Sequence, residues 1–144
     1  MARLNNVVLK NILEYTLFDE MNIEQRIFVT WDMFERAIKH LYDELHVLNR
    51  PFDSIYALPR GGLCLGVKLS YMTGLPLITN KERITPNTLV VDDCTNTGKT
   101  LSAFAGNVTA VMFHKPTAQF RPTLFFQETD KQINFCWESK EERN

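Results

Sequence analysis

The stretch LVVDDCTNTGKT, from Leu89 to Thr100, contains the side chains with the clearest capacity for chemistry in this chain. Its apolar start, Leu89–Val91, predicts a buried strand, and Asp92 and Asp93 follow directly. Two carboxylates are costly to bury, so we expect them at the carboxyl end of the strand, where open α/β sheets bind ligands. In that position they would bind hydroxyl groups or a hard cation such as Mg²⁺.

A polar loop follows the acidic pair and leads into a predicted helix. Residues Thr95–Gly98 offer hydroxyls, an amide and consecutive backbone N–H groups, which together suit a phosphate group. The ending Gly98-Lys99-Thr100 is similar to that of a P-loop, but a P-loop needs a glycine at the position of Asp93. A P-loop kinase or GTPase is therefore disfavoured, and a plain strand and turn with solvated carboxylates is the remaining alternative.

A second candidate anion loop is Pro59-Arg60-Gly61-Gly62, which follows a predicted strand at Asp53–Leu58. The two glycines allow close approach of the backbone to a ligand, and they precede a helix whose free N–H groups favour anions. The guanidinium of Arg60 adds a fork of donors suited to phosphate. Taken alone, the loop is equally compatible with an ordinary turn from strand to helix.

The acidic pair and its loop resemble the motif that binds 5-phosphoribosyl-1-pyrophosphate (PRPP) in the type I phosphoribosyltransferases. Over residues 26–138 the resemblance is closest to the xanthine-guanine (6-oxopurine) phosphoribosyltransferases, with which the chain shares the Arg-Gly-Gly loop. The resemblance implies that Asp92 and Asp93 contact the ribose hydroxyls directly or through Mg²⁺, and that Asp93 is the metal ligand. The implied catalytic residues are Asp92, Asp93 and Asn96. The implied 5′-phosphate ligands are Thr95, Asn96, Thr97, Gly98, Lys99 and Thr100, and the implied pyrophosphate ligands are Arg60, Gly61 and Gly62.

Two residues are candidates for binding a base. Lys115 precedes Pro116 after a predicted strand at Val108–Phe113, and in the resembling family this lysine hydrogen-bonds the exocyclic oxygen of a 6-oxopurine. The alternative is a surface lysine at the end of a strand. Trp137 could stack on a purine, with packing in the core as the alternative.

Three departures from the family pattern keep a second function open. Asn96 stands where the 6-oxopurine enzymes have an aspartate, and an amide exchanges no proton at neutral pH. Gln132 stands where the relatives have a stacking tryptophan. Only Asn80–Asn87 separate two predicted strands that a longer mobile loop joins in the relatives. The leading hypothesis is Mg²⁺-dependent transfer of phosphoribose from PRPP to a nucleobase, a purine in nucleotide salvage. The alternative is a non-catalytic regulatory module that binds PRPP or a nucleotide.

Composition limits the class of partner. The 144 residues are 44% apolar, which predicts a globular domain with a core. The net charge of −1 makes no electrostatic case for nucleic acid or an anionic membrane as partner. Three cysteines, Cys64, Cys94 and Cys136, form no paired motif and indicate free thiols in a reducing compartment. With neither a signal peptide nor a spanning stretch visible, we expect a cytoplasmic protein, and the family resemblance implies a homodimer.

Strands that alternate with helices predict a three-layer, doubly wound α/β fold with a mainly parallel sheet. We place this domain at residues 26–144, after an N-terminal helical extension at residues 1–25 whose helix is Val7–Phe18. The expected helices of the domain are one after Asp32, one that Gly61-Gly62 opens and Gly74 closes, and Thr100–Ala105. The expected strands are Ile27–Thr30, Asp53–Leu58, Leu75–Thr79, Thr88–Val91, Val108–Phe113 and Thr123–Gln127, with a short apolar end at Ile133–Trp137.

Overall fold

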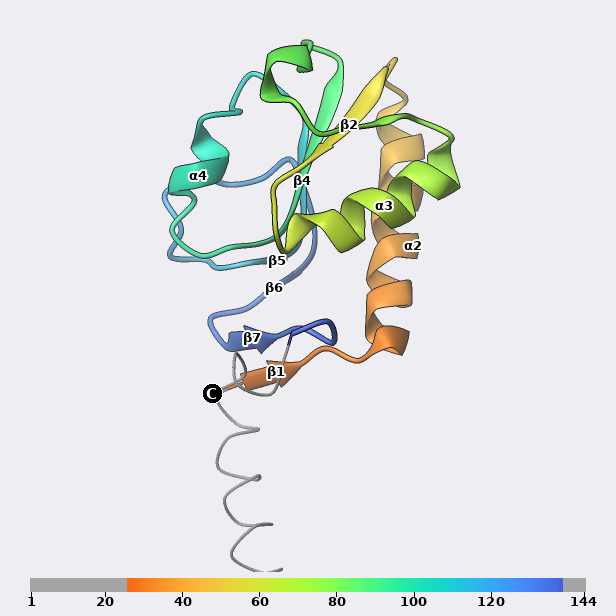
Figure 1. Ribbon diagram of the computed structural model, residues 1–144. Helices are drawn as coiled ribbons and strands as arrows, with labels where there is room; N and C mark the ends of the chain where they lie inside the picture. Colours follow the sequence, from red (N-terminus) through yellow and green to blue (C-terminus); the bar gives the residue numbers. More distant parts are fainter. Residues whose placement is uncertain (1–25, 139–144) are drawn as a thin grey trace, which may run out of the picture. The chain divides into compact units, whose positions relative to one another are not determined.

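A computed structural model describes residues 26–138 of the chain (Figure 1). Its elements are β1 (Arg26–Phe28), α2 (Trp31–Leu48), β2 (Ser54–Ala57), α3 (Gly62–Thr73), β3 (Leu77–Ile78), the 3₁₀ helix η1 (Lys81–Arg83), β4 (Thr88–Thr95), α4 (Lys99–Ser102), β5 (Thr109–His114), β6 (Leu124–Glu128) and β7 (Gln132–Asn134). Residues 32–130 form one compact unit, and the described segments 26–31 and 131–138 belong to a second. The predicted extension at residues 1–25 and its helix lie outside the described residues, so the predicted boundary at residue 26 stays a prediction.

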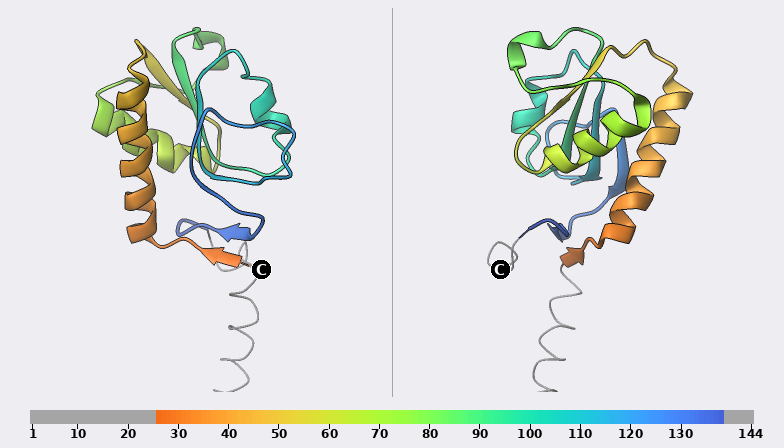
Figure 2. Two further views of the ribbon diagram at one scale, coloured as in Figure 1. Left: turned by 180° about the vertical axis from the view of Figure 1, so that it is seen from behind. Right: turned by 45° about the vertical axis from the view of Figure 1, so that its right-hand side comes forward.

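Residues 32–130 are built on a five-stranded sheet in the order β3-β2-β4-β5-β6. Every neighbouring pair of strands in this sheet is parallel. Figures 1 and 2 show α2 and α3 on one side of the sheet and α4 on the other. The predicted three-layer α/β fold with a mainly parallel sheet is therefore confirmed for this unit.

The alternation of side chains along the strands supplies both faces with a core. Tyr56, Val90 and Val111 cluster with Leu101 of α4 on one face. On the other face α3 lies so close to the sheet that a Cβ on its Gly66 would meet the Ala57 Cβ at 2.5 Å. Since both faces are covered, the strand ends are the part of the sheet left for ligand binding.

The central strand β4 is longer than the sequence indicates. The expectation that it ends at Val91 is wrong, because β5 runs beside it and pairs Cys94 with Phe113 and Thr95 with His114. The acidic pair therefore lies within the strand, where the backbone pairing fixes it, and not in a loop after it. Helix α4 is in turn shorter than the predicted Thr100–Ala105, and hydrogen-bonded turns continue from it, with Ala105 N donating to Ser102 O at 3.2 Å.

The second unit contains a short parallel pair. Strand β1 pairs with β7 from Arg26↔Gln132 to Phe28↔Asn134, and Val29 N extends the pairing by donating to Asn134 O at 2.8 Å. The predicted strand at Ile27–Thr30 and the predicted apolar end at Ile133–Trp137 thus both exist in part. They pair with each other and not with the five-stranded sheet.

Candidate active site

The acidic pair is held rigidly by its own backbone. Asp92 Oδ1 accepts a hydrogen bond from Asp93 N at 2.8 Å, and Asp93 Oδ1 accepts one from Cys94 N at 2.7 Å. Burial and the neighbouring charge of Asp93 raise the pKa of Asp92 to about 8. A cation beside the pair would favour ionisation of Asp92.

The loop Pro59–Gly62 lies directly against this pair. A Cβ on Gly61 would overlap Asp93 Oδ2, and a Cβ on Gly62 would lie 2.8 Å from Val91 O. A Cβ at position 62 would meet the backbone, and a Cβ at position 61 would have room only if the Asp93 side chain moved, so both glycines lie directly against the end of β4. The predicted close approach of this loop to a ligand stays a prediction. The peptide bond between Pro59 and Arg60 is cis.

The loop Thr95–Thr100 turns sharply at Gly98 to begin α4. Gly98 has a φ of 79°, which glycine adopts without cost, and a Cβ on it would lie 2.7 Å from the Phe120 Cβ. Within the loop, Thr97 Oγ1 accepts a hydrogen bond from Lys99 N at 3.2 Å, and Gly98 O accepts one from Ser102 N at 2.9 Å. The side chains of Asn96, Thr97 and Thr100 are exposed, so they are accessible to an anion.

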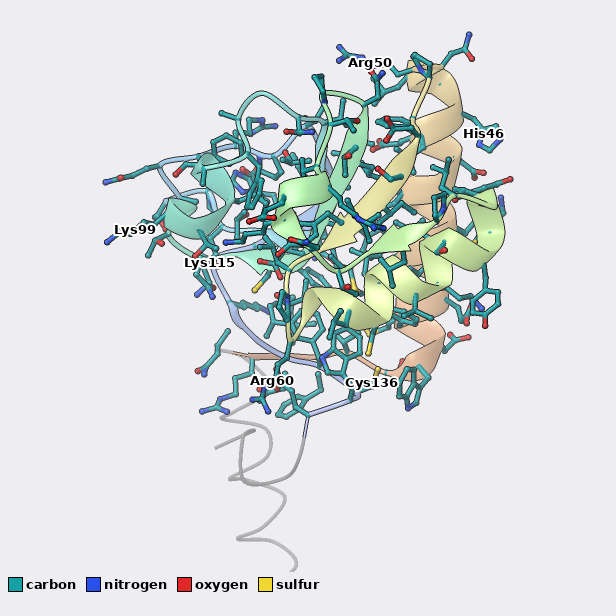
Figure 3. The ribbon with its side chains drawn as sticks, turned by 45° about the horizontal axis from the view of Figure 1, so that its top comes forward. His46, Arg50, Arg60, Lys99, Lys115 and Cys136 are labelled. Carbon is teal, nitrogen blue, oxygen red and sulfur yellow. The ribbon has the colours of Figure 1, made fainter. Side chains whose placement is uncertain are left out.

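A cavity of about 320 Å³ joins these three elements at the carboxyl edge of the sheet. Its lining residues are Pro59, Gly61, Asp92, Asp93, Cys94, Thr95, Asn96, Thr97, Gly98, Thr100 and Leu101. The structure thus brings most of the predicted site residues together around one space. Arg60, Gly62, Lys99 and Lys115 do not line it; Figure 3 shows Lys99 and Lys115 on the α4 side of the unit and Arg60 near the start of α3.

The connection between β5 and β6 is hydrogen-bonded to the candidate phosphate loop. Sequence reasoning did not predict this support. Lys115 N donates to Thr95 O at 3.1 Å, and Gln119 N donates to Thr97 O at 3.0 Å. Together with the contact between Gly98 and Phe120, these bonds join the loop that carries the candidate base-binding lysine to the candidate phosphate loop. The pairing of β4 with β5 sets this alignment, and nothing local in the sequence indicates it.

A buried histidine connects the same two loops. His114 Nδ1 lies 2.6 Å from Thr95 Oγ1, and both side chains are buried. On the other side of the ring, His114 Nε2 lies 3.9 Å from Glu128 Oε1 of β6. Burial lowers the pKa of His114, although the Glu128 charge opposes that change. The sequence feature that could have indicated this contact is a histidine directly before Lys115, at the end of an apolar strand.

Trp137 lies in the second unit, among aromatic side chains of that unit. Its ring stacks on Phe135 with centroids 4.6 Å apart and planes at 9°, and the Trp31 ring lies 6.3 Å away. These contacts fit the packing role weighed as the alternative. Base binding by Trp137 stays a prediction.

Cys94 also lines the cavity. Burial, followed by the charges of Asp93 and Asp92, raises the pKa of its thiol, which stays protonated at neutral pH. All three cysteines are free thiols, as expected.

Within residues 26–138 no cluster of three or more His, Cys, Asp or Glu side chains could hold a metal ion by itself. A cation at the acidic pair would therefore need oxygens from water and ligand, as is usual for Mg²⁺. In the same part of the chain, no helix has the length and apolar character that a membrane crossing requires.

Comparison with solved structures finds the same fold in purine phosphoribosyltransferases. The purine phosphoribosyltransferase of Pyrococcus horikoshii superposes with a TM-score of 0.70 at 27% identity, over 80% of this chain and 95% of that one. The xanthine-guanine-hypoxanthine phosphoribosyltransferase of Helicobacter pylori gives a TM-score of 0.70 at 19% identity, over 82% and 95%. A Neisseria gonorrhoeae protein solved with bound ppGpp gives 0.64 at 19%, over 81% and 91%. No family sequence profile matches the chain, and neither does any curated protein sequence.

These similarities agree with the geometry of the site. The cavity lies at the carboxyl edge of a parallel sheet, between a glycine loop and an acidic pair followed by a threonine-rich loop. The chain therefore has the type I phosphoribosyltransferase fold, and its structure is similar to those of a purine phosphoribosyltransferase and a xanthine-guanine-hypoxanthine phosphoribosyltransferase.

Proposed function

We propose that this protein transfers phosphoribose from PRPP to a purine base with the help of Mg²⁺, in nucleotide salvage. The observation that carries the proposal is the single cavity in which Gly61, Asp93 and the loop Thr95–Thr100 meet. PRPP has a phosphate at one end, a pyrophosphate at the other and two ribose hydroxyls between them. The cavity offers a loop for each anionic end and carboxylates between them.

Several of the predicted ligands would have a distinct function in this arrangement. Backbone N–H groups and the exposed hydroxyls of Thr97 and Thr100 would donate to the 5′-phosphate. The carboxylates of Asp92 and Asp93 would accept hydrogen bonds from the ribose hydroxyls. Arg60, next to Gly61, would donate to the pyrophosphate through its guanidinium.

In the proposed reaction a ring nitrogen of the base forms a bond to ribose C1 while the bond from C1 to the pyrophosphate oxygen breaks. The electron pair of that bond leaves with the pyrophosphate, and the base loses a proton to water. Positive charge develops on the ribose during this exchange. The chain contributes by holding both reactants in line and by placing carboxylates near the sugar.

The donor set fits Mg²⁺. Asp93 supplies a carboxylate at the cavity, and Mg²⁺ commonly takes one or two carboxylates with substrate phosphates and water. Burial and the charge of Asp93 raise the pKa of Asp92 to about 8, and a cation beside both carboxylates would offset this effect. When bound, the ion would neutralise charge on the departing pyrophosphate.

A purine is the proposed acceptor because Lys115 is aligned with the phosphate loop through its backbone bond to Thr95. A lysine ammonium at that place would donate to an exocyclic oxygen, which favours a 6-oxopurine over adenine. Asn96, at the rim of the cavity, would donate or accept a hydrogen bond at the base without exchanging a proton. We further propose a cytoplasmic homodimer, on the family resemblance.

The test is detection of the nucleotide product by mass spectrometry. The full chain is incubated with PRPP, Mg²⁺ and separately guanine, xanthine, hypoxanthine, adenine, the pyrimidines, nicotinamide or nicotinate. We expect product with at least one 6-oxopurine, and no product when PRPP or Mg²⁺ is omitted. If PRPP raises the melting temperature but no base gives product, the protein is a binding module and the transferase proposal is wrong.

Arg60→Ala tests the assignment of the pyrophosphate loop. We expect the KM for PRPP to rise at least tenfold, because the variant loses a charged donor to the pyrophosphate. Arg36→Ala is the matched control, since Arg36 is exposed on α2 and pairs with Asp32 at 3.4 Å. Equal kinetics in both variants would remove Arg60 from the site.

A further inference from the structure

The contact between His114 and Thr95 does more than fill the core. Thr95 is the last residue of β4, directly before the phosphate loop, and it is held at two points by consecutive residues of β5 and the loop that follows. Its Oγ1 lies 2.6 Å from His114 Nδ1, and its backbone oxygen accepts from Lys115 N at 3.1 Å. The start of the phosphate loop and the start of the loop after β5 are thereby fixed to each other.

The surroundings of the ring determine which atom donates. Glu128 Oε1 lies 3.9 Å from His114 Nε2, so a proton on Nε2 is favoured by the carboxylate. Arg121, 3.6 Å from the same Glu128 oxygen, is the other charged group on that side, and the Phe125 ring packs on the imidazole at 5.3 Å between centroids. From β4 the Thr95 hydroxyl faces the ring. With the proton on Nε2, Nδ1 accepts, and the Thr95 hydroxyl donates to it.

This direction has a consequence for the site. A threonine hydroxyl has one hydrogen, and that of Thr95 is used inside the protein. The side chain of Thr95 is therefore not a donor to phosphate, unlike the exposed hydroxyls of Thr97 and Thr100. Thr95 acts as the fixed end of the loop.

We propose that His114 is a positioning residue, which sets the phosphate loop through Thr95 so that its N–H groups and hydroxyls converge on PRPP. The proposal rests on the proposed function, since it takes PRPP as the ligand of that loop. His114 itself touches no substrate. Its effect is on binding of the 5′-phosphate and on the alignment of Lys115 with it.

The first measurement determines which ring nitrogen of His114 carries the proton. Long-range ¹H–¹⁵N spectra of the full chain, labelled at histidine nitrogens, distinguish the neutral tautomer protonated on Nε2 from that protonated on Nδ1. His114→Asn identifies the signal among those of His40 and His46. We expect the Nε2 tautomer at pH 7.5, whereas a proton on Nδ1 would reverse the hydrogen bond and overturn the proposal.

The second measurement is PRPP affinity by calorimetry in the presence of Mg²⁺. His114→Leu removes the acceptor, and we expect the Kd for PRPP to rise at least tenfold, with kcat changed less than KM. His114→Asn places an amide oxygen near the Nδ1 position, and we expect it to restore most of the affinity. His46→Asn, at an exposed histidine whose Nδ1 lies 3.0 Å from Tyr42 O, is the matched control.

The outcomes separate this proposal from the proposed function. If the wild-type chain binds PRPP and His114→Leu binds it equally well, the positioning role is wrong and the proposed function stands. If His114→Leu and His114→Asn lose affinity equally, the ring only fills space and the role is again wrong. If the wild-type chain does not bind PRPP, the proposed function fails and the positioning role fails with it, whatever the tautomer.

Discussion

Carboxylates lie at both ends of the strands of the five-stranded sheet, here called the amino edge and the carboxyl edge. Their pKa values are shifted in opposite directions. At the amino edge, Asp53 accepts hydrogen bonds from Ser54 Oγ and Thr85 Oγ1, each at 2.6 Å, and these bonds lower its pKa. At the carboxyl edge, burial and a second carboxylate raise the pKa of Asp92 to about 8. A charged group whose partners all come from the chain has a structural role. A charged group without enough partners within the chain indicates a ligand.

The partners of the amino edge form a closed network. Ser54 Oγ lies 2.8 Å from Thr88 Oγ1, and Asn107 Nδ2 donates to the backbone oxygens of Thr85 and Thr88 at 2.8 and 2.9 Å. This network holds the connection between β3 and β4 in place. The comparison therefore predicts that changes at the amino edge affect stability and changes at the carboxyl edge affect function.

The largest expected effect is that of Asp93→Asn. We expect kcat/KM to fall at least 100-fold, because the variant keeps the shape of the side chain but loses the charge that would hold Mg²⁺ and the ribose. Steady-state product formation at saturating base measures it. Asp43→Asn, the same change at an exposed carboxylate of α2, is the control, and equal activity of the two variants would contradict the role of the carboxyl edge.

Gly61→Ala is expected to come next, with at least a tenfold loss of activity. Its Cβ would overlap Asp93 Oδ2, so the carboxylate proposed to hold Mg²⁺ and the ribose would have to move. Gly106→Ala is the control, since a Cβ there meets nothing within 4 Å. Activity assays together with melting curves check the prediction, and it is wrong if Gly61→Ala is as active as the control.

Asp92→Asn is expected to separate stability from function. Because its folded pKa of about 8 lies above the usual value of 3.8, the folded chain gains a proton between these values. Stability of the wild-type protein should therefore fall as pH rises through that window. At pH 9 we expect Asp92→Asn to unfold at a higher temperature, by about 1–2 kcal/mol in stability, with the difference shrinking toward pH 5. A variant that melts below the wild type at pH 9 would refute the raised pKa of Asp92 in the folded chain.

The smallest expected effect is that of Asp53→Asn. We expect a lower Tm at pH 7 with unchanged kcat, because the variant weakens bonds at the amino edge only. Since the pKa of Asp53 is lowered, its contribution is present above pH 3.8 and is lost as pH falls through the folded value. Melting curves from pH 7 to pH 3 should converge for wild type and variant. A loss of activity comparable to that of Gly61→Ala would contradict the claim that the amino edge affects stability alone.

Sequence reasoning found the part of the site that is contiguous in the chain. The acidic pair, its threonine-rich loop and the Arg-Gly-Gly turn are each short patterns within the chain, and they are informative because they occur together. The parallel α/β fold was equally accessible through alternating patterns. The register between neighbouring strands could not be predicted from the sequence. The end of β4 at Thr95 depends on pairing with His114, which lies 19 residues further along the chain. The support of Gly98 by Phe120 depends on the same pairing and has no signature in either segment.

The charged and partly buried carboxylates at the cavity also bear on how long the protein survives in a cell. A ligand that binds only the folded chain at a hundred times its Kd adds about 2.7 kcal/mol of stability, which lowers the population open to proteases roughly a hundredfold. A ligand bound at the cavity that Asp92 and Asp93 line would stabilise the folded chain in this way. The amount of the protein in the cell would then follow the supply of its ligand.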